Sequence, residues 1–190
     1  MAVGFYFDMT RCTGCRACQV ACKDKNRLDV GTIFREAKSY TVGSFPQVQG
    51  YSYSASCNHC ENPACVIACS EGAIYKAEDG TVIIDQAVCT GAGDCIAACP
   101  YGVPKPMPDG KANKCDGCYA IRQAGGIPAC VAACPNRALD FGDIEELKAK
   151  YGEGLVSDIA ILPASDLTTP NLLIKAKDAA LESDYNEVMW

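Results

Sequence analysis

The pattern of hydrophobic and polar positions along this chain consists of short apolar runs that stop at a polar residue just before a cysteine. Phe5–Asp8 is followed after three residues by Cys12, and Ile83–Asp85 is followed after three residues by Cys89. This repeat predicts, twice over, a short strand, an aspartate and then a cysteine-rich loop.

The other regular elements that the pattern predicts are equally short. A β-hairpin is predicted over residues 73–84, because two apolar runs flank Asp79-Gly80, a favourable turn pair. A helix is predicted over residues 143–151, with Asp143 as its N-cap.

Two long segments have neither a cysteine nor a clear period. Residues 23–56 are predicted as a long loop with strand character at residues 51–54. Residues 155–190 are predicted as an extended tail, because Pro163 and Pro170 oppose a helix there. The expected fold class is therefore α+β, with short strands and helices and much loop.

Cysteine changes this picture. It accounts for 15 of 190 residues, close to the share that marks a disulfide or metal scaffold. The cysteines fall into four groups: Cys12, Cys15, Cys18 and Cys22; Cys57, Cys60, Cys65 and Cys69; Cys89, Cys95 and Cys99; and Cys115, Cys118, Cys130 and Cys134.

Disulfides and zinc are the first two interpretations of these thiols. A disulfide framework favours an even number of cysteines spread along the chain, whereas here the number is odd and the neighbours are two or three residues apart. Zinc has the right arithmetic, because the 15 cysteines and the single His59 would fill four tetrahedral sites. However, His59 lies in the second group, while the group that lacks a ligand is the third.

Iron–sulfur clusters explain the spacing better. Three cysteines at C-x2-C-x2-C wrap one loop around one cluster, and a fourth, one helical turn later, ligates the other cluster of a pair. The C-x3-C-P endings at Cys99-Pro100 and Cys134-Pro135 are typical of this arrangement.

Adjacency along the chain predicts how the groups pair. The second and third groups are neighbours, so residues 57–100 are expected to form one ferredoxin-like two-cluster module. The first and fourth groups then pair across it, in a discontinuous outer module of residues 1–56 and 101–142. Residues 143–190 add the helix and the C-terminal tail.

The third group lacks its middle cysteine, because Ala92 occupies that position. A methyl group cannot ligate iron, so we expect a [3Fe–4S] cluster at this site. The alternative is a [4Fe–4S] cluster with water or Asp94 on its fourth iron.

Cross-ligation within each pair then assigns every cysteine to one of four sets. Three sets are expected to hold [4Fe–4S] clusters and the last a [3Fe–4S] cluster. Set one is Cys12, Cys15, Cys18 and Cys134; set two is Cys22, Cys115, Cys118 and Cys130; set three is Cys57, Cys60, Cys65 and Cys99; and set four is Cys69, Cys89 and Cys95.

The remaining features narrow the function. A net charge of −6 gives little support for a nucleic-acid partner. There is no secretory signal and no run of eighteen apolar residues, so the chain is not expected to export or anchor itself. No catalytic constellation is found. His59 is expected either to tune a cluster by a hydrogen bond to sulfur or to pack beside the ligand loop.

At this point the sequence resembles the iron–sulfur subunits of the dimethyl sulfoxide reductase family of molybdoenzymes. The resemblance covers nearly the whole chain, with Ser70 and Ala92 as departures from the family pattern. It is carried by residues 12–23, 57–65, 95–102, 126–135 and 168–174.

The resemblance implies a non-catalytic subunit that relays electrons to or from a molybdopterin-containing catalytic subunit of an anaerobic respiratory oxidoreductase. The outer pair of clusters would face that subunit, and the inserted pair a membrane-anchor, quinol-interacting subunit or a soluble electron donor. Such a chain is membrane-associated through its partners and can be exported bound to the catalytic subunit, with a cytoplasmic location as the alternative.

A free-standing polyferredoxin shuttle is the alternative function. The long tail disfavours it, because a shuttle does not need 36 residues without a ligand. We expect the tail to lie along the catalytic subunit. Trp190 is expected either to anchor on a partner or to be an ordinary terminal residue. The alternative is that the tail covers the chain's own cluster modules.

Overall fold

The computed structural model describes residues 2–188, so Trp190 lies outside the described residues. The strands are β1 (Val3–Asp8), β2 (Glu36–Val42), β3 (Gln49–Ala55), β4 (Ile74–Lys76), β5 (Val82–Ile84), β6 (Lys105–Pro106), β7 (Ala112–Asn113), β8 (Leu139–Asp143), β9 (Leu172–Lys175) and β10 (Asn186–Val188). The helices are α1 (Ala17–Lys25), α2 (Ala64–Ile67), α3 (Asp94–Ala98), α4 (Tyr119–Gln123), α5 (Ala129–Ala132), α6 (Ile144–Tyr151) and the 3-10 helices η1 (Ser165–Leu167) and η2 (Asp178–Ala180). This mixture of short elements confirms the predicted α+β class.

Strand β1 is the centre of a three-stranded sheet with the order β8-β1-β9, in which it runs antiparallel to β8 and parallel to β9. All six of its residues are buried, because its side chains alternate between two faces that are both covered. On one face Tyr6 stacks on Tyr151 of α6, with ring centroids 3.5 Å apart. On the other face Phe7 meets Tyr53 of β3 edge to face at 5.4 Å. The predicted strand at residues 5–8 is confirmed.

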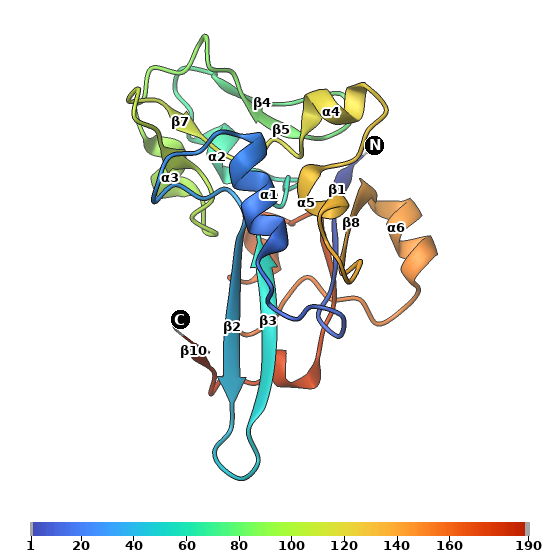
Figure 1. Cartoon of the computed structure of the whole chain (residues 1–190). Helices are drawn as coiled ribbons and strands as arrows, with labels where there is room; N and C mark the ends of the chain where they lie inside the picture. Colours follow the sequence, from blue (N-terminus) through green and yellow to red (C-terminus); the bar gives the residue numbers. More distant parts are fainter. Residues whose placement is uncertain (1, 189–190) are drawn as a thin grey trace.

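The predicted loop over residues 23–56 is wrong. Helix α1 continues to Lys25, and β2 and β3 pair along their whole length in a hairpin that extends beyond the body of the protein (Figure 1). The strand character expected at residues 51–54 is present in β3. Strand β2 escaped prediction because its sequence is mostly polar and buries only Ala37, Tyr40 and Val42.

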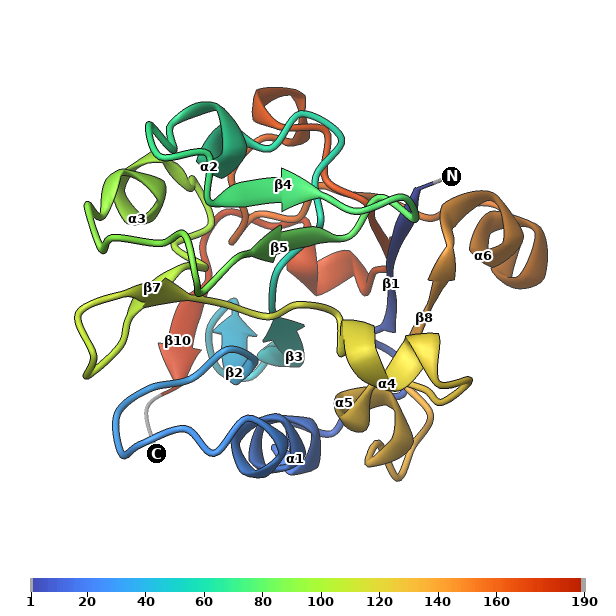
Figure 2. The same cartoon turned by 90° about the horizontal axis from the view of Figure 1, so that it is seen from above.

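The predicted hairpin over residues 73–84 is confirmed as β4 and β5, which pair antiparallel. The Asp79 carboxylate accepts a hydrogen bond from the Thr81 backbone N–H at 2.9 Å and so stabilises the turn. Figure 2 shows α2 and α3 beside this hairpin, with α1, α4 and α5 on the opposite side of the molecule. The small β6–β7 hairpin also packs here, because Ala112 belongs to the same apolar cluster as Cys65 and Ile84.

The helix predicted at residues 143–151 is confirmed as α6. The Asp143 carboxylate caps it by accepting hydrogen bonds from the backbone N–H groups of Glu145 and Glu146. Gly152 ends it with a φ of +80°, a conformation that glycine adopts without strain.

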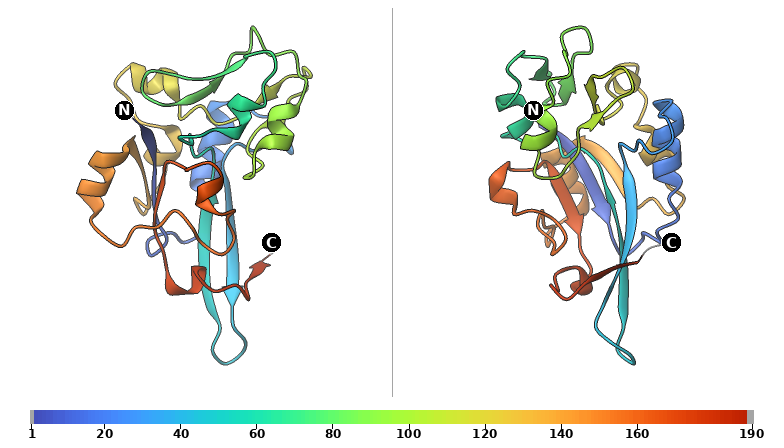
Figure 3. Two further views of the ribbon diagram at one scale, coloured as in Figure 1. Left: turned by 180° about the vertical axis from the view of Figure 1, so that it is seen from behind. Right: turned by 90° about the vertical axis from the view of Figure 1, so that its left-hand side faces the viewer.

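The C-terminal segment packs on the rest of the same chain. Figure 3 shows it passing the inserted module and β1 before it reaches the β2–β3 hairpin. Ile174 of β9 is fully buried, and the Thr169 carbonyl accepts a hydrogen bond from the Glu61 backbone N–H at 2.8 Å. Strand β10 pairs with β2. The expectation that this segment lies along a partner is therefore wrong for its buried part. That part instead packs on the same chain, as the alternative predicted.

Candidate metal centres

Set one lies where β1 runs into α1. The Asp8 carboxylate accepts a hydrogen bond from the Thr10 backbone N–H at 2.9 Å, which fixes the turn before the ligand loop. Gly14 follows with a φ of +69°, and a Cβ at this position would lie 2.7 Å from the Ser52 hydroxyl oxygen, so only glycine fits. All four cysteines of set one line one cavity, to which α5 contributes Cys134 at its C-terminal end.

Set two is assembled by the packing of α1 against α5 and by the loop that precedes α4. Burial, together with the neighbouring sulfurs of set two, raises the pKa of Cys22 to about 12. The pKa of Cys130 is also raised by burial, with the nearby Arg35 acting in the opposite direction. These effects agree with a grouping of Cys22 with the cysteines of set two that lie about 100 residues later in the chain.

Set three lies around α2 and the C-terminal end of α3. Its four cysteines line one cavity, together with Lys114 and Thr168. Burial raises the pKa of Cys60 to about 11 and that of Cys65 to about 12. Thr168 belongs to the C-terminal segment, so the tail contributes directly to the wall of this site.

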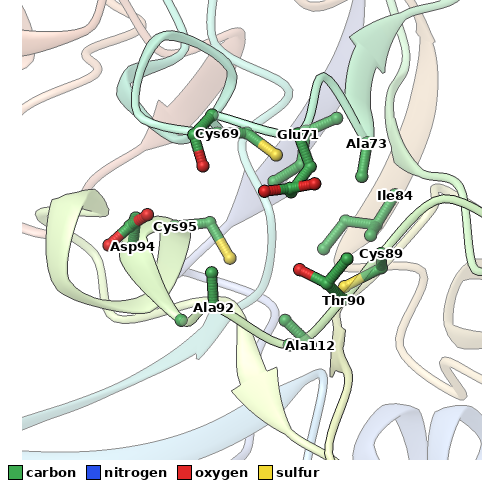
Figure 4. Close-up of a pocket in the computed structure, with 14 residues that line it drawn as sticks. Cys69, Glu71, Ala73, Ile84, Cys89, Thr90, Ala92, Asp94, Cys95 and Ala112 are labelled. Carbon is green, nitrogen blue, oxygen red and sulfur yellow. The ribbon is translucent and has the colours of Figure 1, made fainter.

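Set four lines a cavity between the end of α2, the β4–β5 hairpin and the start of α3. Figure 4 shows its three sulfurs facing the same space, with the Ala92 methyl group beside Cys95. Asp94 lies beyond Cys95, outside the ring of sulfurs, whereas the Glu71 carboxylate is directed over the cavity. The structure therefore brings Ala92 to this cavity without providing a thiol there.

The arrangement of the sulfurs fits bodies with several metal atoms. Among residues 2–188, no three His, Cys, Asp or Glu side chains converge closely enough to hold a single metal ion. The sulfurs of sets one, three and four instead line cavities, as ligands at the corners of a larger inorganic body would. Thiols with raised pKa values are neutral at pH 7, and binding of iron would ionise them. The zinc interpretation loses support because one zinc ion needs four convergent ligands.

Comparison with known proteins identifies the family. Residues 48–144 match the model of the 4Fe-4S dicluster domain. The sequence is 45% identical to the B subunit of the anaerobic dimethyl sulfoxide reductase of Haemophilus influenzae, over 95% of this chain and 93% of that protein. It is also 45% identical to the protein of the same name from Escherichia coli, over 90% and 87%. The Escherichia coli protein NrfC is 41% identical over 79% of this chain and 69% of its own length.

The chain belongs to the family of iron–sulfur, electron-transfer subunits of the dimethyl sulfoxide reductase type. The recognition made from the cysteine segments is thereby confirmed. The match with the Haemophilus influenzae protein spans nearly all of both sequences, so the likeness is not confined to the cysteine segments. No helix in the described part of the iron–sulfur subunit is both long and apolar enough to cross a membrane.

Two buried cations of the iron–sulfur subunit escaped prediction from the sequence. Arg35 is 1% exposed and donates hydrogen bonds to the Ser54 carbonyl and hydroxyl and to the Ser56 hydroxyl. Lys114 is 3% exposed and contacts the Cys57 sulfur at 3.5 Å. The position of Lys114 directly before a ligand cysteine was a usable signal. Arg35 gave none, because it lies in the segment predicted as a loop.

His59 is fully buried between sets two and three. Its Nδ1 accepts a hydrogen bond from the Val82 backbone N–H at 3.1 Å, so the ring proton belongs on Nε2. Burial lowers the pKa of His59 although Cys115 is close enough to oppose this, and the ring is therefore neutral at pH 7. Nε2 forms no hydrogen bond with the described protein atoms. His59 thus packs beside the ligand loops, which is one of its two predicted roles. Its Nε2–H group is also available to donate a hydrogen bond to a ligated sulfur.

Proposed function

We propose that this subunit relays electrons through four iron–sulfur clusters to or from a molybdopterin-containing catalytic subunit. The observation that carries the proposal is the grouping of 15 cysteines into four sets, three of which each line a cavity of their own. A free-standing polyferredoxin is less well supported, because the relatives that match over most of their length are named as parts of a reductase.

The proposed cofactors are three [4Fe–4S] clusters at sets one to three and one [3Fe–4S] cluster at set four. Each of the first three sets supplies four thiols, whereas set four supplies three and has Ala92 at the remaining position. Asp94 is a poor substitute ligand, because its side chain lies outside the ring of sulfurs (Figure 4). If a fourth iron bound here, Glu71 would be the better placed source of an oxygen ligand.

The proposed order of electron transfer is set one, two, three and four. Neighbouring sets share an element: α1 carries Cys18 of set one and Cys22 of set two, and α2 carries Cys65 of set three, with Cys69 of set four just beyond its end. Sets two and three meet at Lys114. This order corresponds to an outer module of residues 1–56 and 101–142 and an inserted module of residues 57–100. Residues 105–113 pack with the inserted module and extend it beyond residue 100.

The proposed partners follow from the two ends of this order. Set one would face the catalytic subunit, and set four a membrane-anchor, quinol-interacting subunit or a soluble electron donor. The subunit would then be held at a membrane by its partners. Its proposed role is electron transfer rather than catalysis, within an anaerobic respiratory oxidoreductase similar to the reductase after which its relatives are named.

The test of the cofactor assignment is Ala92→Cys in the full-length chain, purified without oxygen. The unmodified protein should contain about 15 iron atoms and no stoichiometric zinc, and its oxidised form should show the EPR signal of a [3Fe–4S] cluster. Ala92→Cys should remove that signal, add about one iron and add a reduced [4Fe–4S] signal. Ala149→Cys on the exposed side of α6 is the matched control and should change neither.

Two outcomes would contradict these assignments. A colourless protein saturated with zinc would refute the electron relay itself. A brown protein that never shows a [3Fe–4S] signal, even when prepared without oxygen, would refute only the assignment of set four.

A further inference from the structure

Lys114 lies at the junction between sets two and three. It follows β7 and directly precedes Cys115 of set two, while its ammonium group contacts the Cys57 sulfur of set three at 3.5 Å. The same ammonium donates hydrogen bonds to the Val82 carbonyl and, at 3.1 Å, to the Cys115 carbonyl. The side chain is thereby fixed in one place, with its charge against a sulfur of set three and beside the backbone of a set-two cysteine.

Arg35 occupies the corresponding place between sets one and two. Its guanidinium carbon stands 4.3 Å from the centroid of the Phe5 ring, and Ser54 and Ser56 accept its hydrogen bonds. Burial disfavours its charge, yet its pKa is raised by the sulfurs around it, which are Cys130, Cys115, Cys18 and Cys22. These sulfurs belong to sets one and two only.

Neither cation has a carboxylate partner among the described residues. An ionised group buried without an opposite charge is very costly, and hydrogen bonds to neutral oxygens compensate only part of that cost. The nearest groups that can become anionic are the cysteine sulfurs, which are thiolates when they ligate iron. The missing counter-charge is therefore the cluster with its thiolates.

We propose that Arg35 and Lys114 are the counter-cations of the cluster relay, one at each junction that flanks the set-two cluster. The inference rests on the proposed function, since it needs clusters at sets one to three. Reduction adds a negative charge to a cluster, and a nearby cation in a poorly solvated site favours that step. The two cations thus raise the reduction potentials of the clusters beside them, and the set-two cluster receives the effect of both. The set-four cavity has neither cation in its lining.

The test is an EPR-monitored redox titration of the full-length, cluster-loaded chain carrying Lys114→Met, Arg35→Met or both. Lys114→Met should shift two potentials to more negative values, those of sets two and three. Arg35→Met should shift those of sets one and two, and the double variant should shift three, the set-two potential most. The [3Fe–4S] potential should stay in place. Each shift should correspond to a roughly tenfold change in the ratio of reduced to oxidised cluster at fixed potential, which is about 59 mV for one electron.

Lys148→Met on the exposed face of α6 is the matched control, because it removes the same charge far from the junctions and should move no potential. Unchanged potentials in fully iron-loaded Lys114→Met and Arg35→Met would overturn the proposal, and so would equal shifts in all variants and the control. If the Met variants do not retain iron, the charge-conserving variants Lys114→Arg and Arg35→Lys replace them. Iron that is retained with near-normal potentials in these variants supports a requirement for the positive charge. Loss of iron from them indicates that the side chains matter only for packing, and overturns the proposal. Absence of iron from the unmodified chain would refute the proposed function instead.

Discussion

Replacing Ile174 with alanine should lower the stability of the β8-β1-β9 sheet, in which a strand near the N-terminus pairs with one from the C-terminal segment. Ile174 lies in β9 opposite Phe7 of β1, is fully buried, and exchanges backbone hydrogen bonds with Val156 at 2.7 and 2.9 Å. Truncation of a fully buried isoleucine to alanine costs about 2–5 kcal/mol, because apolar contacts are lost and the cavity closes only partly. The upper half of that range is expected here, since both faces of the sheet are packed.

Hydrogen exchange followed by mass spectrometry measures this effect without requiring reversible unfolding of a cluster protein. The loss of about 2–5 kcal/mol corresponds to a fall in amide protection of about 30-fold to several-thousand-fold. The fall should appear in peptides that cover β1 and β9. Leu181→Ala is the matched control, because Leu181 follows η2 in the same segment but is 55% exposed, and it should change protection very little. If the amides of β1 exchanged as slowly in the Ile174→Ala variant as in the Leu181→Ala variant, β9 would not be part of the core.

Two further predictions concern the same packing. Truncation after Gly154 removes β9 and its three buried side chains, so the shortened chain should lose iron or solubility; a soluble product with full iron content would show that the segment is dispensable. Asp79→Asn should cost about 1–3 kcal/mol at neutral pH in urea unfolding, since it weakens a largely buried 2.7 Å bridge to Arg122, and exposed Glu145→Gln should cost little. Burial raises the pKa of Asp79, but bonds from Arg122 and Thr81 outweigh it and hold the pKa below its usual value. The bridge therefore contributes in full above about pH 4 and less as pH falls below it, and Asp79→Asn should lose that part of the acid sensitivity.

The elements that could be predicted from the sequence are those whose signal is local. A few adjacent residues are enough to determine each of three features: the turn at Asp79-Gly80, the cap at Asp143 and the apolar run of β1. The cysteine spacing is equally local, because a cluster imposes its geometry on one short loop. The grouping of Cys22 with Cys130 stays a prediction, which needs the additional rule that the last cysteine of one group ligates the other cluster of its pair.

The parts that could not be predicted depend on long-range pairing. Strand β2 is polar along most of its length and becomes a strand because β3 and β10 pair with both of its edges. The tail was predicted as an extended segment on a partner because its apolar residues are scattered without a period, yet β9 needs only four residues beside β1 to be buried. Arg35 could not be assigned a role from the sequence, and Lys114 offered only its position before a ligand cysteine, since a buried cation is recognised only once its surroundings are known.

The inserted module shows why fold and electron relay cannot be separated in this subunit. Its apolar cluster of fully buried residues is small, and two of its six members are ligands: Cys65, Ile74, Val82, Ile84, Cys95 and Ala112. A core of this size does not hold a module together without further bonds. The proposed clusters would supply them, because the cysteines of set three come from α2 and the end of α3, and those of set four from just beyond α2 and the start of α3. The proposed cross-ligation would therefore close the fold and also bring the two clusters next to each other, which is the condition for electrons to pass between them.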